Sequence, residues 1–193
     1  DNLGPSFQMT MAHETYHCYQ RWNYMAQMFG PSLLEGNAKQ VSVFALARKW
    51  WVEGTAEFFA NFVYPCVQTE HERVPGFDWK SDRTPLLDMA YENVVFFMHM
   101  GHSSPGPIIR MSRNMAGDGG KEEQYIAAHH FGLGNYFHDF AQDYIDENIL
   151  DSCPGTRIDV RPDVQRYEVQ RGYEREFELD RFVLGRIELG FSD

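Results

Sequence analysis

His13, Glu14 and His17 form an H-E-x-x-H pattern near the start of the chain. In a helix, residues four apart lie on one face, so the two imidazoles can bind one metal ion together. Glu14 sits beside them, where its carboxylate can take a proton from a metal-bound water. Zinc accepts nitrogen and oxygen ligands tetrahedrally and leaves one position open for water. The pattern therefore predicts a zinc site, provided that its flanks are helical and a third ligand follows.

Two further acids, Glu53 and Glu57, lie one helical turn apart in the segment W-W-V-E-G-T-A-E-F-F-A. Two carboxylates on one face of an otherwise apolar helix are costly to bury unless a positive group holds them. A metal ion with its histidines supplies that charge, so this segment is the candidate source of the third ligand. Without a metal, the two acids are expected to be solvated on a half-exposed helix.

The elements that must position these groups are expected to be helices. Apolar residues between about 6 and 29 recur at helical spacing and predict one amphipathic helix, with Ser6 as N-cap and Gly30-Pro31 as its end. The apolar stripe of this helix comprises Phe7, Met11, Cys18, Trp22, Met25 and Phe29. A second helix is expected at about 39–63, where Gly54 would let it approach the first helix closely.

H-E-x-x-H followed by W-x-x-E-G-x-A-E resembles the gluzincin zinc metallopeptidases, the clan of thermolysin and the M1 aminopeptidases. The second motif is matched by Trp50, Glu53, Gly54, Ala56 and Glu57. The resemblance implies a zincin-like fold in which Glu53 is the third zinc ligand, and Glu57 is the acid that orients a zinc-bound histidine. It also implies peptide-bond hydrolysis, with Glu14 as the general base that activates a zinc-bound water.

Two other zinc-peptidase patterns fit less well. Metzincins have H-E-x-x-H-x-x-G-x-x-H, but Gln20 and Asn23 occupy the positions of the glycine and the third histidine. Aspzincins carry G-T-x-D, and Gly54-Thr55-Ala56-Glu57 is a near match in which Glu57, not Glu53, would bind the metal. The spacer between the two motifs is longer than in thermolysin, which predicts an inserted segment at about 31–40.

A third helix is expected at about 85–100, with Thr84 as N-cap and Tyr91 near its start. In the M1 aminopeptidases a tyrosine on the corresponding helix stabilises the transition state, so the resemblance implies a catalytic role for Tyr91. A core aromatic at helical spacing is the alternative. One of His129 and His130 is a further candidate for contact with an oxyanion, as in thermolysin-like enzymes. The remaining histidines, which include His71, show no ligand spacing with a nearby acid.

From about residue 155 onward, apolar and polar residues alternate, which predicts β-strands. The alternating groups are Ile158 and Val160; Tyr167 and Val169; Phe177 and Leu179; Phe182 and Leu184; and Ile187, Leu189 and Phe191. We therefore expect a mainly α (α+β) chain, with a zincin-like helical catalytic domain at 1–152 and a β segment at 153–193 that is part of a small or truncated β domain. The β-sheet subdomain of gluzincins has no counterpart before His13, so further domains of a longer chain are expected.

Composition agrees with an enzyme that has one good core. Hydrophobic residues make up 43% and aromatic residues 15% of the 193 residues, and the net charge is −11. No apolar run approaches the roughly 20 residues of a membrane span, and the negative charge argues against a nucleic-acid partner. Cys66 and Cys153 lie beside prolines in turn-like contexts, as disulfide cysteines often do, whereas Cys18 is expected to be a buried thiol. We expect a secreted or periplasmic protein.

The expected function is zinc-dependent cleavage of a peptide or protein substrate. One zinc ion per chain would be held by His13, His17 and Glu53, with Glu14 and Tyr91 as catalytic residues. Two alternatives remain. One is a non-catalytic protein that keeps the zincin fold as a scaffold or peptide-binding module. The other is a structural zinc site, although such sites usually have four protein ligands rich in cysteine.

Overall fold

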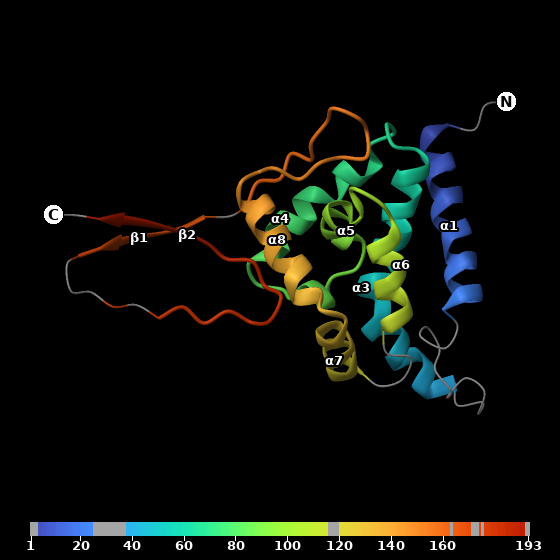
Figure 1. The fold of residues 1–193 in the computed structure, drawn as a ribbon, viewed down its shortest axis with the longest axis horizontal. Helices are drawn as coiled ribbons and strands as arrows, with labels where there is room; N and C mark the ends of the chain where they lie inside the picture. Colours follow the sequence, from blue (N-terminus) through green and yellow to red (C-terminus); the bar gives the residue numbers. More distant parts are fainter. Residues whose placement is uncertain are drawn as a thin grey trace.

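The computed structural model describes residues 4–24, 38–115, 120–162, 164–170, 174 and 176–191, with side chains from Lys49 onward in the second range. The protein is mainly helical, with a small two-stranded sheet near the C-terminus (Figure 1). Its α-helices are α1 (Pro5–Asn23), α3 (Ala38–Val63), α4 (Val74–Ser81), α5 (Val94–Gly101), α6 (Gly106–Asn114), α7 (Lys121–Phe131) and α8 (Leu133–Ile145). Short 3₁₀ turns are η2 (Thr69–Glu72), η3 (Leu86–Asp88) and η4 (Tyr91–Asn93), and the strands are β1 (Val164–Val169) and β2 (Arg186–Phe191).

Helix α5 lies at the centre of the hydrophobic core. Every residue of its sequence VVFFMHMG except His99 is buried, because an apolar run without a polar face has to be surrounded by protein. Large side chains from α3, α4 and α8 belong to the same core: Trp50, Phe58, Phe77, Phe140 and Tyr144. This core holds α3 in place, and α3 in turn supports α1.

Helix α1 packs alongside α3 at the edge of the helical body (Figure 1). It begins at Pro5 with Gly4 as its N-cap, so the prediction of Ser6 as N-cap is wrong. Pro5 is suited to the first helical position because its missing N–H would have no partner there. The helix ends at Asn23. Met25, Phe29 and most of the predicted insertion at 31–40 lie outside the described residues.

The face of α1 that packs against α3 is not the predicted apolar stripe. The exposed residues include Phe7, Met11, Cys18 and Trp22, whereas the buried residues are Met9, Tyr16 and Gln20. Contacts with α3 decide this orientation: the Tyr16 ring stacks on Phe59, with ring centroids 4.0 Å apart. Cys18 is therefore an exposed thiol, and the prediction that it is buried is wrong.

Gly54 allows a close approach of α3, but not to α1. A Cβ atom at this position would lie 2.6 Å from the Phe97 ring and 2.9 Å from Cβ of Asn93. Glycine is therefore needed where α3 crosses α5 and η4, and the predicted approach to the H-E-x-x-H helix is wrong.

The segment 85–100 is not the continuous helix that Thr84-Pro85 predicts. Two 3₁₀ turns, η3 and η4, precede α5, which begins only at Val94. Asn93 accounts for the break, because its buried side-chain amide donates to the carbonyl oxygens of Leu86 at 2.9 Å and Trp50 at 3.1 Å. These bonds tie both turns to α3, and Tyr91 lies on η4 instead of in a helix.

Among the described residues, only two of the predicted strand segments pair. Strands β1 and β2 are parallel, with Val164 opposite Arg186 and Val169 opposite Phe191, and they extend away from the helical body (Figure 1). The segment between them bonds to the helices instead: the Leu86 N–H donates to the Phe182 carbonyl at 2.9 Å, and the Leu184 N–H to the Ser81 carbonyl at 2.8 Å.

None of the predicted strands at 158–160, 177–179 and 182–184 forms, so these predictions are wrong. The first and third segments lie against the helices. Phe177 and Leu179 are exposed instead, and the Phe177 ring contacts Tyr167 of β1 with centroids 5.1 Å apart. Ile158, Val160 and Leu184 are buried in the same core as α5. Residues on both sides of the predicted boundary at 152 thus share one hydrophobic core.

A disulfide joins Cys66 to Cys153 across a sequence separation of 87 residues. It connects the chain after α3 to the loop after α8, in the turn-like positions noted in the sequence. None of the helices in the described part of the chain has the length and apolar character to cross a bilayer.

Candidate metal centre

Helices α1 and α3 bring three ligand atoms together. His13 Nε2 and His17 Nε2 lie 2.9 Å apart, as the four-residue spacing on α1 predicts. Glu53 Oε2 approaches from α3, 3.5 Å from His13 Nε2 and 3.3 Å from His17 Nε2. Tetrahedral ligands at zinc distances of roughly 2.0–2.2 Å would lie about 3.3–3.6 Å from one another. The three atoms therefore have close to the separations that a shared ion requires.

Burial and charge at this triad also favour a cation. The side chains of His13, His17 and Glu53 are 12%, 23% and 17% exposed. Glu53 Oε2 is fully buried and has no hydrogen-bond partner among the described residues. Burial alone would raise the pKa of Glu53, but the two imidazoles outweigh it and hold the pKa well below its ordinary value. Glu53 is thus a buried carboxylate anion with a free lone pair directed at two imidazoles.

Gln20 sets the tautomer of His17. Its Nε2 donates to the Val52 carbonyl and to Thr55 Oγ1, each at 2.8 Å. Because a carbonyl can only accept, the amide oxygen of Gln20 must face His17, whose Nδ1 is 2.7 Å away. His17 Nδ1 therefore carries the proton, and Nε2 keeps its lone pair for a metal. Gln20 is fully buried and occupies the metzincin glycine position, but sequence reasoning did not predict a role for its side chain.

The predicted contact of Glu57 with an imidazole is wrong. Glu57 Oε1 instead accepts a hydrogen bond from Arg73 Nη2 at 2.8 Å. Arg73 directly follows η2, and its positive guanidinium binds the Glu57 carboxylate in place of a histidine. Gln20, and not Glu57, therefore orients one of the two candidate ligand histidines, His17.

A polar pocket of about 350 Å³ opens in front of His13. Its lining includes Glu14, Glu57, Arg73 and Tyr91. Glu14 is exposed to this pocket from α1. A substrate bound here would contact Glu14, which the sequence analysis predicts to be the general base, and the neighbouring His13.

Tyr91 is part of this pocket and not of the core. Its ring stacks on His13 with centroids 6.0 Å apart, and Arg73 Cζ lies 4.9 Å from the ring centroid on the tyrosine. Partial burial and the negative charge of Glu53 raise the pKa of Tyr91, so the hydroxyl stays protonated at neutral pH. The side chain is 40% exposed, which leaves it accessible to a ligand.

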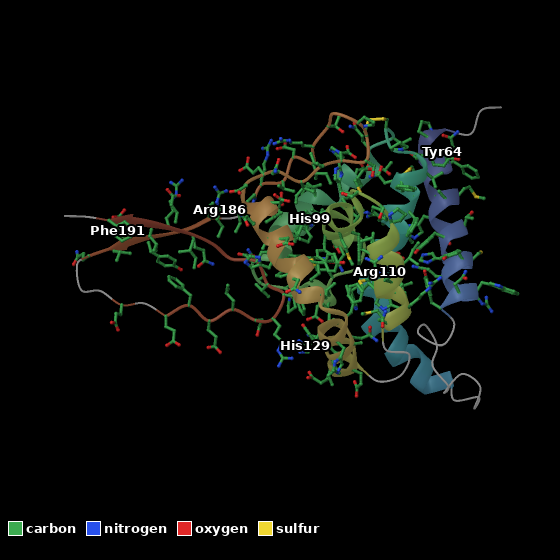
Figure 2. All side chains as sticks on the ribbon, viewed as in Figure 1. Tyr64, His99, Arg110, His129, Arg186 and Phe191 are labelled. Carbon is green, nitrogen blue, oxygen red and sulfur yellow. A yellow bond between two sulfur atoms is a disulfide. The ribbon has the colours of Figure 1, made fainter. Side chains whose placement is uncertain are left out.

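His129 and His130 do not belong to this centre. Both line a different cavity of about 700 Å³, together with Tyr125, Phe137 and Phe182. Figure 2 shows His129 on α7, and neither histidine is among the residues that line the pocket in front of His13. The suggestion that one of them contacts an oxyanion at the metal centre is therefore wrong.

The structure also forms a cluster that sequence reasoning missed. His71 Nε2 lies 3.0 Å from Asp151 Oδ2 and 3.5 Å from Glu70 Oε1. The adjacent Glu70 was a local signal, but Asp151 is 80 residues away and no spacing rule connects it to His71. Arg73 was missed for the same reason, since its contact with Glu57 depends on the position of η2.

Comparison with protein families, curated proteins and solved structures finds no match to this chain. The chemistry of the centre has therefore to be argued from its own residues.

Proposed function

We propose that this protein is a zinc-dependent peptidase of the gluzincin type. The observation that carries the proposal is the convergence of His13 Nε2, His17 Nε2 and Glu53 Oε2, which lie 2.9–3.5 Å from one another. Two nitrogen ligands and one oxygen ligand suit zinc, and a set of three leaves a coordination position open, as in catalytic sites. The fixed tautomer of His17 and the unpaired oxygen of Glu53 support the same assignment.

When bound, zinc would lower the pKa of water towards neutrality and polarise a carbonyl group. Glu14 is the candidate general base, because it lines the pocket next to His13 and has its carboxylate open to solvent. It would accept the proton of the attacking water and deliver it to the leaving amine. No other side chain of α1 combines a carboxylate with a position at this pocket.

Tyr91 is the candidate donor to the oxyanion of the tetrahedral intermediate. Its hydroxyl is protonated at neutral pH, and its ring is held between His13 and Arg73. Arg73 fixes the ring by a cation–π contact while its guanidinium is bound to Glu57. Glu57 would thus act on the site through Arg73 and Tyr91. The disulfide between Cys66 and Cys153 is compatible with a secreted or periplasmic location.

The proposal is tested by measuring zinc content and then hydrolysis of a mixed fluorogenic peptide library, with and without a chelator. Glu14→Gln keeps the shape of the side chain but removes the proton acceptor. It should keep its zinc and lose about 10²–10⁴-fold in turnover. Glu72→Gln is the matched control, because Glu72 lines the same pocket and has no assigned role.

The possible results separate the candidate functions. A zinc-loaded wild-type protein that binds peptides without cleaving them would identify a peptide-binding module. Zinc that contributes only to stability would identify a structural site. Near-normal turnover in Glu14→Gln with normal zinc content would exclude Glu14 as the base.

A further inference from the structure

Glu70, His71 and Asp151 bring three potential ligand atoms within 4.8 Å of one another, outside the pocket of the first centre. Glu70 and His71 lie on η2, and Asp151 lies in the loop after α8. His71 Nε2 lies 3.0 Å from Asp151 Oδ2 and 3.5 Å from Glu70 Oε1, close to the separations among His13, His17 and Glu53.

Glu70 is buried without a hydrogen-bond partner among the described residues. Its side chain is 1% exposed, and neither carboxylate oxygen has a partner among the described residues. An unpaired buried carboxylate is strongly destabilising unless a cation is present or a proton is bound.

His71 by itself does not supply the missing charge. Its Nε2 has at most one proton, and the closer acceptor is Asp151 Oδ2 at 3.0 Å. That bond leaves Glu70 without a donor. A divalent cation has no such restriction, because it can contact Glu70, His71 and Asp151 at once.

Asp151 is already oriented as metal-binding carboxylates usually are. Its Oδ1 accepts from the Cys153 backbone N–H at 3.2 Å, and Thr156 Oγ1 lies 3.0 Å from its Oδ2. Its side chain is fully buried, while that of His71 is 31% exposed and provides a route for an ion to enter. Hydrogen bonds that orient a ligand carboxylate are typical of metal centres.

We propose that Glu70, His71 and Asp151 form a second metal site for a divalent first-row transition metal. One imidazole with two carboxylates suits zinc, manganese or cobalt better than calcium or magnesium, which prefer oxygen ligands alone. The ion would link η2 to the loop after α8. These are the same two regions that the disulfide between Cys66 and Cys153 joins, so the site is a structural clamp. It does not depend on peptidase activity.

The test is the number of metal ions bound per chain. The protein is first stripped of metal with a chelator, then loaded with Zn²⁺ or Co²⁺ and dialysed. Its metal content is measured by elemental mass spectrometry. Wild-type protein should bind two ions, and His17→Ala and His71→Ala should bind one each. The double variant should bind none. His99→Ala is the matched control, because His99 also pairs with a carboxylate, Asp143 at 2.9 Å, but belongs to no three-ligand group of the described residues (Figure 2).

Glu70→Gln removes a ligand charge while keeping the size of the buried side chain, so it tests the site if His71→Ala fails to fold. It should bind one ion, and added Zn²⁺ should raise its thermal midpoint less than that of wild type. The second site is refuted if the folded His17→Ala variant binds no metal. It is also refuted if His71→Ala and Glu70→Gln bind as many ions as wild type. If an ion is lost in His17→Ala but in neither His71→Ala nor Glu70→Gln, the proposed catalytic centre is supported and the second site is refuted. The two proposals can therefore fail separately.

Discussion

At the scale of single residues, Gln20 connects α1, which carries His13 and His17, to α3. Its amide donates twice to α3 and accepts from His17 Nδ1, so one buried side chain both joins the helices and selects an imidazole tautomer. Outer hydrogen-bond partners of ligand histidines contribute strongly to metal affinity. The sequence placed this role on Glu57, which Arg73 binds instead.

Gln20→Met should weaken zinc binding on the order of 10–100-fold, because His17 loses the acceptor that fixes its tautomer. It should also destabilise the fold by about 1–3 kcal/mol, since the Val52 carbonyl and Thr55 lose their donor. Zinc affinity is measured by chelator competition and stability by denaturant unfolding. Gln8→Met is the control, because Gln8 is exposed on the same helix. Equal zinc affinity in Gln20→Met and Gln8→Met would show that Gln20 does not contribute to metal binding.

Tyr91→Phe should lower turnover by about 10²–10³-fold while zinc content stays unchanged, because one donor to the oxyanion is lost. The stacking on His13 needs only the ring, so the unfolding free energy should change little. Tyr19→Phe is the matched control on an exposed tyrosine of α1 outside this pocket. Unchanged kcat/KM in Tyr91→Phe would limit the residue to packing.

At the scale of the elements, the crossing of α3 with α5 and η4 holds Glu53 at its place. Gly54 allows that crossing, because Phe97 and Asn93 occupy the space that a side chain would need. Because Gly54 packs against α5 and η4, the adjacent Glu53 is held on a different side of α3, where it faces α1.

Gly54→Ala should destabilise the protein by about 1–3 kcal/mol, since the added methyl group has to push Phe97 or the η4 backbone aside. The displacement should also move Glu53 and weaken zinc binding. Gly134→Ala, on α8, is the control, because a Cβ there meets no atom within 4 Å. Alanine favours helix more than glycine, so this variant should be neutral or slightly more stable. Denaturant unfolding of both proteins distinguishes crowding from a general effect of alanine.

At the scale of the whole molecule, the disulfide between Cys66 and Cys153 closes most of the helical body into one loop. The bond joins positions 87 residues apart, on either side of α4, α5, α6, α7 and α8. Closing a loop of this length in the unfolded chain removes much of its conformational entropy.

Cys66→Ala/Cys153→Ala should lower the unfolding free energy by about 2–5 kcal/mol. For a chain of this size the thermal midpoint should fall on the order of 10 °C. Calorimetry measures the change, and Cys18→Ala is the control because Cys18 is an exposed free thiol. If the double variant and Cys18→Ala unfold at the same temperature, the cross-link contributes nothing to stability.

Local sequence was sufficient for the features that depend on neighbours within a helical turn. Two histidines four apart converge because the helix repeats every 3.6 residues. The local pattern also predicted the start of α1 and both ends of α3 to within one residue, whereas α1 ends at Asn23 and not at the predicted Gly30-Pro31. Alternation correctly predicted strands at the residues of β1 and β2, and the second half of the helix predicted at about 85–100 is present as α5. Glu53 and Glu57 were both identified as acids on an otherwise apolar helix, and the resemblance to gluzincins selected Glu53 as the ligand.

Contacts between groups far apart in the sequence became evident only from the packing of the helices. Gln20 meets residues 32 and 35 positions away on α3, and His71 meets Asp151 across 80 positions. Such contacts depend on how helices are placed against one another, which local periodicity does not encode. The same reason explains why the most apolar face of α1 is exposed. The helix turns towards Phe59, on which Tyr16 stacks, and towards the α3 groups that bond to Gln20, and hydrophobic spacing alone cannot identify those partners.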